Sequence, residues 1–239
     1  MKLVNYFLVF ICIALTTSQC KGQTDKPSED YEYKSGSFDG IGKWYKDREI
    51  AHVMGYQGIS WLERPEREKE ENTSRLIKNM DISPRDTIAD IGAGSRYHVF
   101  KIAPLAEKGL VYAVDIQKEM LNAIRDQKKE TGAKNIELIK GTEQSINLPE
   151  NSVNKILMVD VYHEFNYPIE MLTSMHKALR KNGEIYLIEY RGEDETIPIK
   201  KLHKMTESQA VKEFEANGFR LKENIDNLPW QHCMVFVKE

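Results

Sequence analysis

The sequence predicts an α/β fold, in which a doubly wound and mostly parallel sheet carries helices on both faces. Short apolar runs alternate with helical patterns along most of the chain, as such a sheet requires. The first of these runs ends in an acidic, glycine-rich turn that leads into a helical pattern. The chain has 239 residues, 41% of them hydrophobic, and can therefore bury one substantial core.

The elements of this domain, which we place at residues 83–239, follow in order along the chain. Concentrated apolar side chains indicate strands near 87–91, 110–115, 136–140, 153–159 and 184–189. The clearest helix is expected at 167–180, where Leu172, Met175 and Leu179 share one face and Gly183 follows the end. A helix at 207–217 and two strands joined by a short turn, at 220–225 and 232–238, complete the pattern.

Residues 1–20 have the composition of an export signal. Lys2 precedes an apolar stretch that is too short to span a bilayer, and Cys20 follows that stretch. This arrangement resembles the bacterial lipoprotein signal, in which Cys20 would be acylated and would anchor the protein to a membrane. Cleavage near Ser18 and an uncleaved anchor are the alternatives. We therefore expect a membrane-associated or exported protein, and a domain that faces the cytosol remains an open orientation.

Two segments separate this signal from the domain. Residues 21–37 are polar and lack apolar periodicity, which is typical of a flexible tether. Residues 38–82 are expected to form an N-terminal helical extension, because Pro65 can begin a helix and Leu76, Ile77 and Met80 would give that helix one apolar stripe. Four of its side chains are candidates for a lid over the site: His52, Trp61, Glu63 and Arg64.

Charge and cysteine content exclude several classes of function. The 34 basic and 37 acidic residues are interspersed, so the chain has no basic face for nucleic acid. Of its three cysteines, Cys12 and Cys20 lie in the signal and Cys233 lies in the last apolar run. No cysteine and histidine spacing is typical of a metal site, and we therefore expect no bound metal.

The glycine-rich turn indicates a nucleoside-binding site. Gly92 and Gly94 can adopt positive φ and let a ligand approach the backbone, and the next helix directs its first amides toward the same crevice. Asp115 ends the following strand, where a carboxylate can accept hydrogen bonds from both ribose hydroxyls. The alternative for Asp115 is a cap on the helix that begins near Gln117. Tyr97 stands where a dinucleotide fingerprint has Gly or Ala, which disfavours NAD and FAD.

Asp90-Ile91-Gly92-Ala93-Gly94 resembles motif I of the class I S-adenosylmethionine-dependent methyltransferases. The resemblance covers roughly residues 50–239, and its most specific stretches are LMVDVYHEFNYP and IEYRGEDETIPIKKLHKMT. It implies a Rossmann-like sheet of seven strands that ends in an antiparallel hairpin. The chain departs from the motif at Arg96, where a third glycine is usual. Arg96 would either pair with the cofactor carboxylate or block the pocket.

The resemblance also implies that S-adenosylmethionine is the cofactor and assigns roles to side chains at the strand ends. Asp90 would orient the ammonium group of the methionine part, and Ile116 would lie against the adenine. Thr142 or Glu143 would contact the adenine amino group. Asp160 would border the methionine end and the methyl group.

Catalytic candidates follow the fourth strand of the predicted domain. Methyl transfer is an in-line displacement, so positioning dominates, and a base is needed only when the acceptor keeps its proton. Tyr162 and His163 lie where the acceptor would meet the methyl group, and His163 could be that base. The alternative for His163 is a helix-start residue with a satisfied hydrogen bond. His203 and Arg191 are second candidates for contacting the acceptor.

These observations favour an enzyme that transfers a methyl group to a small molecule. The Asn/Asp-Pro-Pro-aromatic motif of enzymes that methylate planar amines is absent, since DVYHEF stands in its place. The alternative is a catalytically inactive, membrane-tethered binding protein that keeps the fold. The export signal conflicts with a cofactor that is made and used in the cytosol. Either the signal anchors a domain that faces inward, or the exported domain uses another ligand, or it has lost catalysis.

Overall fold

The structure is a computed structural model that describes residues 30–94 and 96–239. The predicted signal, its Cys12 and Cys20, and most of the predicted tether lie outside the described residues. Within the described part, no helix has both the length and the apolar character needed to cross a membrane.

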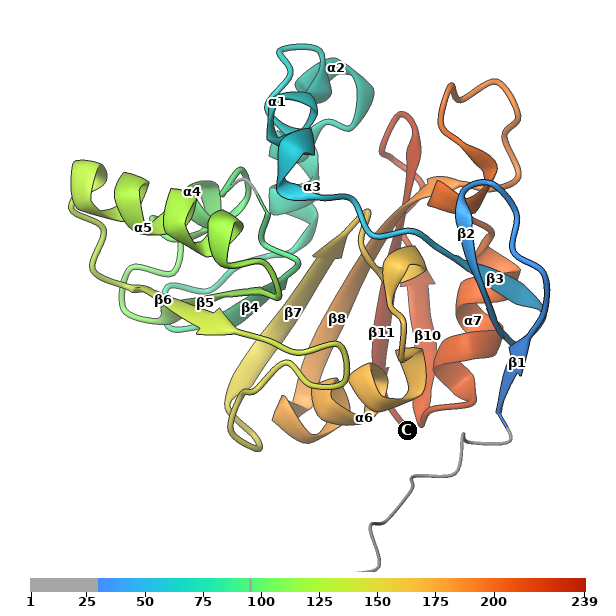
Figure 1. Cartoon of the computed structure of the whole chain (residues 1–239). Helices are drawn as coiled ribbons and strands as arrows, with labels where there is room; N and C mark the ends of the chain where they lie inside the picture. The colour runs from blue at the N-terminus through green and yellow to red at the C-terminus, as the bar shows by residue number, and fades with distance from the viewer. Residues whose placement is uncertain (1–29, 95) are drawn as a thin grey trace, which may run out of the picture.

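A large mixed sheet runs through the centre of the molecule (Figure 1). Its strand order is β10-β11-β8-β7-β4-β5-β6, and the short β9 pairs with β8, which makes eight strands in all. The strands from β6 to β8 run parallel, whereas β11 is antiparallel to both β8 and β10. The predicted α/β class and the antiparallel hairpin are therefore confirmed. The bounds are β4 Thr87–Ile91, β5 Leu110–Asp115, β6 Ile136–Lys140, β7 Val153–Val159, β8 Leu179–Arg191, β9 Lys204–Met205, β10 Phe219–Asn224 and β11 Gln231–Lys238.

The order of strands reverses direction at β4. This strand pairs with β5 on one side and with β7 on the other, because the chain runs outward from β4 to β6 and then crosses back to β7 on the other side of β4. Such a switch point opens a crevice at the carboxyl ends of the strands. Both cavities described below lie at this edge of the sheet.

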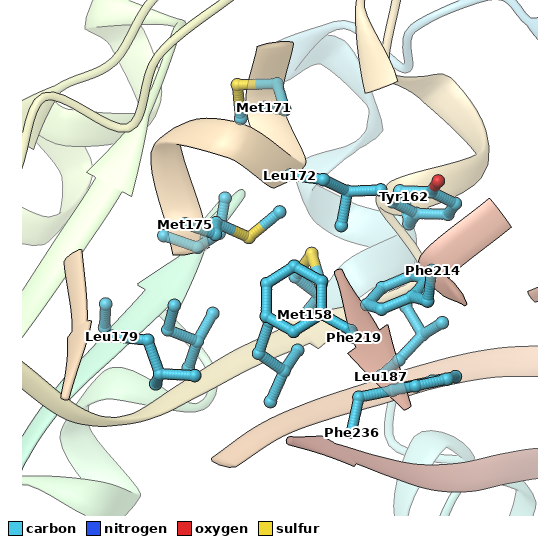
Figure 2. Packing of buried hydrophobic residues seen from close by; sticks show 14 of the residues in the cluster. Met158, Tyr162, Met171, Leu172, Met175, Leu179, Leu187, Phe214, Phe219 and Phe236 are labelled. Carbon is cyan, nitrogen blue, oxygen red and sulfur yellow. The ribbon is translucent and has the colours of Figure 1, made fainter. Parts of the chain in front are cut away.

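Helices cover the sheet on both faces. On one face, strand residues such as Met158 and Leu187 pack against Leu172 and Met175, and Phe214 stacks on Phe236 with ring centroids 4.1 Å apart (Figure 2). A second core on the opposite face includes residues of β4, β5 and the helices that follow them. The helices are α4 Val99–Ile102, α5 Lys118–Thr131, α6 Pro168–Ala178 and α7 Glu207–Glu215.

The N-terminal region differs from the predicted helical extension. Three strands, β1 Tyr31–Tyr33, β2 Gly40–Tyr45 and β3 Arg48–Ala51, form a small antiparallel sheet. The helical prediction for residues 38–82 is therefore wrong over β2 and β3, and the predicted tether contains β1. Lys46 and Asp47 join β2 to β3 with φ of 51° and 73°, the geometry of a type I′ hairpin turn.

Helices follow the small sheet, but as short pieces rather than as one helix after Pro65. They are α1 Ile59–Leu62, α2 Arg67–Glu70 and α3 Thr73–Asn79. Asn72 has φ of 54° between α2 and α3, and its side chain accepts a hydrogen bond from the Arg75 amide. The predicted apolar stripe is confirmed, since Leu76 and Met80 are buried and Ile77 packs against the same core.

Candidate functional site

The first cavity, which we call the switch-point cleft, lies over the glycine turn between β4 and α4. Gly92 and Gly94 have φ of +70° and +51°, as the sequence predicts for this turn. A Cβ atom on Gly92 would lie 2.5 Å from Val161 Cγ2, so glycine is required there by both conformation and space. Other residues that border the cleft are Leu62, Ile91, Val114, Asp115, Ile116, Gln117, Met120, Gly141, Thr142, Glu143, Asp160, Glu164 and Phe165.

Asp115 links the glycine turn to the next strand. Its Oδ2 accepts a hydrogen bond from the Gly94 amide at 2.9 Å, and its Oδ1 accepts one from the Gln117 amide at 2.7 Å. Burial raises the pKa of Asp115, although these amides act in the opposite direction. The carboxylate therefore ties the glycine turn to Gln117, the residue before α5, but α5 has no side-chain cap hydrogen bond, so the cap interpretation is not confirmed. Each oxygen keeps a second lone pair for a ligand in the cleft.

The predicted adenine contacts also lie at the cleft. Ile116 is 38% exposed and presents an apolar side chain there. Thr142 and Glu143 are exposed on the loop after β6, and Glu143 Oε1 accepts a hydrogen bond from Asn166 Nδ2 at 2.9 Å. The fold thus brings these three residues to one edge of the cavity that Asp115 borders.

The two other predicted cofactor residues differ in position. Asp90 is 2% exposed and is not among the residues that line the cleft, so its predicted contact with an ammonium group stays a prediction. Burial raises the pKa of Asp90 to about 7. Asp160 does border the cleft, and its Oδ2 accepts a hydrogen bond from Gln231 Nε2 at 2.7 Å. Burial also raises the pKa of Asp160 well above its usual range.

Tyr162 was a catalytic candidate, and the structure corrects this interpretation. Its side chain is fully buried in the core beside Phe214 (Figure 2). Its hydroxyl donates to Glu213 Oε2 at 2.8 Å. It lines neither the switch-point cleft nor the second cavity. The physical reason is that the 3-10 helix Tyr162–Glu164 turns Tyr162 under α7 while His163 stays at the strand edge.

A second cavity, which we call the histidine cavity, adjoins the cleft. Asp160, Glu164, Val53 and Met54 border both spaces. The remaining residues around the histidine cavity come from several segments: Asp39, His52, Trp61, His163, Tyr190, Pro198, Ile199, Lys200 and His203.

The two predicted histidines meet in this cavity. His163 Nε2 lies 3.0 Å from His203 Nδ1, and His163 Nδ1 lies 2.6 Å from Glu189 Oε2. On the far side, His203 Nε2 lies 3.0 Å from Asp39 Oδ2. The sequence places Glu189 among the strand-end residues of the site but gives it no role, and it does not indicate Asp39. Glu189 stands at a strand end that the predicted fold placed at this edge, but no sequence signal pairs Asp39 with His203.

The surroundings shift the pKa values of these groups in different directions. Burial acts to lower the pKa of His163, but the Glu189 carboxylate outweighs it and the pKa is raised. Burial and the neighbouring His163 lower the pKa of His203 to about 4. Burial raises the pKa of Glu164 to about 7. The cavity therefore holds groups whose proton affinities lie far from their ordinary values.

Arg191 and Arg96 lie away from both cavities. Arg191 donates to the Leu228 and Pro229 carbonyls and pairs with Asp226, so the expected contact with an acceptor is wrong in this structure. Arg96 has φ of 77° and pairs with Glu63 at 3.2 Å, and it is not among the residues that border the cleft. Residue 96 thus has a positive φ, which explains why glycine is usual at this position of the motif.

Of the four expected lid residues, two border a cavity and two do not. His52 and Trp61 border the histidine cavity. Arg64 packs over the Trp61 ring at 3.9 Å and pairs with Glu70 and Glu71. The extension therefore covers this edge of the sheet through Trp61 and His52, whereas Arg64 holds its own segments together and Glu63 pairs with Arg96 after the glycine turn.

Comparisons with known proteins agree with this architecture. An uncharacterized methyltransferase of Bacillus subtilis, YcgJ, is 22% identical over 164 residues, which are 67% of this chain and 64% of that protein. The chain thus spans less than two thirds of that relative's length. A second B. subtilis protein, the uncharacterized methyltransferase YdaC, is 24% identical over 63% of this chain and 78% of its own length.

Solved structures show the same fold. A SAM-dependent methyltransferase from Aquifex aeolicus superposes with a TM-score of 0.72 at 23% identity, over 77% of this chain and 98% of that chain. A family model described as a methyltransferase domain matches residues 82–233, which is more than half of the sequence. The chain therefore belongs to the methyltransferase domain family.

Proposed function

We propose that the protein is an S-adenosylmethionine-dependent methyltransferase that acts on a small molecule. The observation that carries this proposal is the switch-point cleft, where a positive-φ glycine turn and the Asp115 carboxylate face one cavity. Family membership and the S-adenosylmethionine-dependent neighbour in fold support the same cofactor.

The chemistry of the cleft fits a nucleoside with an amino-acid tail. Gly92 and Gly94 leave room for the methionine part to approach the backbone. The Asp115 carboxylate can accept hydrogen bonds from ribose hydroxyls, and Ile116 and Met120 offer apolar surface to the adenine. When bound, the cofactor supplies a methyl group on a sulfonium centre. The chain's own residues then need only to hold the two reactants in line and exclude water.

The histidine cavity is the place that we propose for the acceptor. It adjoins the cleft through Asp160 and Glu164 and is lined by polar groups, and His203 is 20% exposed in its side chain. The interspersed charges of the chain offer no extended basic surface for a nucleic acid. A small polar acceptor is the ligand class that this space favours.

Calorimetry with S-adenosylmethionine tests the proposal. We expect saturable binding to the purified protein, and Asp115→Asn should weaken it by roughly 10-fold to 100-fold, because a shielded charge-assisted hydrogen bond contributes about 1.5–3 kcal/mol. Asp126→Asn on the exposed face of α5 is the matched control and should leave the affinity unchanged. No binding at millimolar cofactor would exclude the proposed function. Binding without transfer to any acceptor would favour the inactive binding protein instead.

A further inference from the structure

We propose that His163, His203 and Glu164 form a binding site for a divalent transition metal, with Zn²⁺ as the ion that the ligand set suits best. The sequence interpretation expected no metal, because the ligands lie on two segments that the spacing does not connect. The 3-10 helices Tyr162–Glu164 and Lys201–His203 bring them together in the histidine cavity.

The distances among the three ligand atoms fit a metal centre. His163 Nε2 and His203 Nδ1 are 3.0 Å apart, and Glu164 Oε1 lies 3.7 Å from each of them. A point equidistant from three atoms with these separations lies about 2.0 Å from each, and zinc binds imidazole nitrogen and carboxylate oxygen at about 2.0–2.2 Å. The three donors therefore require little movement to hold an ion.

The outer nitrogen of each imidazole faces a carboxylate. Glu189, which is fully buried, lies 2.6 Å from His163 Nδ1, and Asp39 lies 3.0 Å from His203 Nε2. Histidines that bind metals usually donate their other N–H to a carboxylate or carbonyl, which fixes the ring and its tautomer. Here His163 has this hydrogen-bond partner in Glu189, and the Asp39 carboxylate lies within ion-pair distance of the outer nitrogen of His203. The Met54 amide also donates to Glu164 Oε1 at 3.1 Å, which orients the third ligand.

The order of donors and acceptors from Glu189 through the two histidines to Asp39 leaves room for a cation between the rings. A carboxylate oxygen lies near each outer nitrogen, and a tautomer with its proton on that nitrogen leaves the inner nitrogen free to bind a ligand. When both rings have this tautomer, the two inner nitrogens face each other with lone pairs, and a cation between them stabilises the arrangement. Either an extra proton or a metal ion can be that cation. The Glu164 carboxylate beside both nitrogens favours the metal, because a single shared proton does not use this third donor.

The site opens into a cavity that is rich in carboxyl groups, one of which, on Asp39, pairs with Lys200. The cavity has a volume of about 400 Å³, and Asp39, Asp160 and Glu164 all border it. Two histidines and one carboxylate are the ligand set of catalytic rather than structural zinc sites, and they leave a fourth position open. An acceptor with an oxygen, nitrogen or sulfur ligand could occupy that position beside the cleft. This last step rests on the proposed function, whereas the metal site itself does not.

Zn²⁺ titration of the full-length protein after dialysis against a chelator tests the proposal without any cofactor. We expect one equivalent of Zn²⁺ per chain in a calorimetric titration. Co²⁺ should substitute for it and show visible ligand-field absorption, and either metal should raise the melting temperature. Absence of stoichiometric binding to the unmutated protein, by all three measurements, would overturn the proposal whatever the result with S-adenosylmethionine.

Variants then assign the ligands. His163→Ala and His203→Ala should each weaken Zn²⁺ binding by roughly 100-fold or more, and Glu189→Gln by roughly 10-fold to 100-fold through the orientation of His163. His232→Gln is the matched control, because His232 also contacts a carboxylate, Glu193, but lacks a second histidine beside it. Unchanged Zn²⁺ affinity in folded His163→Ala or His203→Ala would contradict the assignment. Circular dichroism checks that each variant is folded.

Discussion

The switch-point cleft and the histidine cavity are both bordered by Asp160 and Glu164, but their other lining groups differ. Around the cleft, glycines and apolar side chains lie beside the Asp115 carboxylate, which two backbone amides hold in place. Around the histidine cavity, side chains from distant segments pair with one another. The cleft therefore suits a ligand with a large surface, and the histidine cavity suits a compact, polar or cationic one.

The difference shows how one sheet edge can support two kinds of site. The cleft depends on the strand-to-helix turn after β4 and needs few residues outside it. The histidine cavity depends on the small N-terminal sheet, because Asp39 directly precedes β2 and Arg48 on β3 donates to the His163 carbonyl at 3.1 Å. Changes to the small sheet should therefore affect the two sites unequally.

The largest expected effect comes from Arg48→Ala. Arg48 pairs with Glu213 through two hydrogen bonds, at 2.7 and 2.9 Å, and Glu213 is fully buried. Removing Arg48 leaves this carboxylate without its cation and should cost about 3–5 kcal/mol of the unfolding free energy in urea denaturation. Lys212→Ala breaks the exposed pair between α7 and Asp47 and is the matched control, with no measurable loss. Equal losses in the two variants would show that the buried pair does not anchor the sheet.

Gly92→Ala, in the glycine turn of the cleft, should cause the next largest loss of unfolding free energy. The new Cβ would clash with Val161 in a backbone conformation that alanine disfavours, and we expect a loss of about 2–4 kcal/mol by denaturation. Gly132→Ala is the matched control, because Gly132 has φ of +68° with no atom within 4 Å of the added Cβ. It should lose only about 1 kcal/mol. If Gly92→Ala cost no more than the control, close packing at the turn would be refuted.

Asp90→Asn should change how stability depends on pH. The pKa of Asp90 is raised from 3.8 to about 7, so the folded protein keeps a proton that the unfolded chain releases. Asp90 therefore lowers stability progressively as pH rises through this window. The variant should be more stable than the unmutated protein by roughly 2–4 kcal/mol at about pH 8, and nearly equal to it at about pH 4. A constant difference across pH would mean that Asp90 is ionised in the folded protein.

The smallest expected effect is that of Arg96→Gly. Arg96 has φ of 77°, which glycine adopts without strain, and its pair with Glu63 is one-third exposed on both sides. We expect a gain of about 1 kcal/mol in thermal or chemical denaturation. The affinity for S-adenosylmethionine should change little, because the guanidinium does not border the cleft. A large gain in that affinity would instead show that Arg96 blocks the pocket.

The parts of the molecule that sequence reasoning found are local in the chain. The apolar runs that form β4 to β7 have the bounds that their composition predicts, and Gly92 and Asp115 stand directly at strand ends. The small sheet was missed because its hairpin turn, Lys46-Asp47, lacks the Asn-Gly or Asp-Gly sequence that usually marks this geometry.

The histidine cavity was found only in part for a related reason. His163 and His203 were expected at the strand edge, but their partners depend on pairing over long separations. Asp39 reaches His203 only because the small sheet docks there, and such docking leaves no periodic signal in the sequence. Tyr162 was misassigned because the turn of a short 3-10 helix decides which neighbour faces the cavity.

One cross-titration tests most directly whether the two cavities are separate sites. S-adenosylmethionine and Zn²⁺ are each titrated into Asp115→Asn and His203→Ala. We expect Asp115→Asn to lose affinity for the cofactor and keep its affinity for the metal, and His203→Ala to show the reverse. Loss of both ligands in both variants, or of neither ligand in either variant, would contradict this expectation.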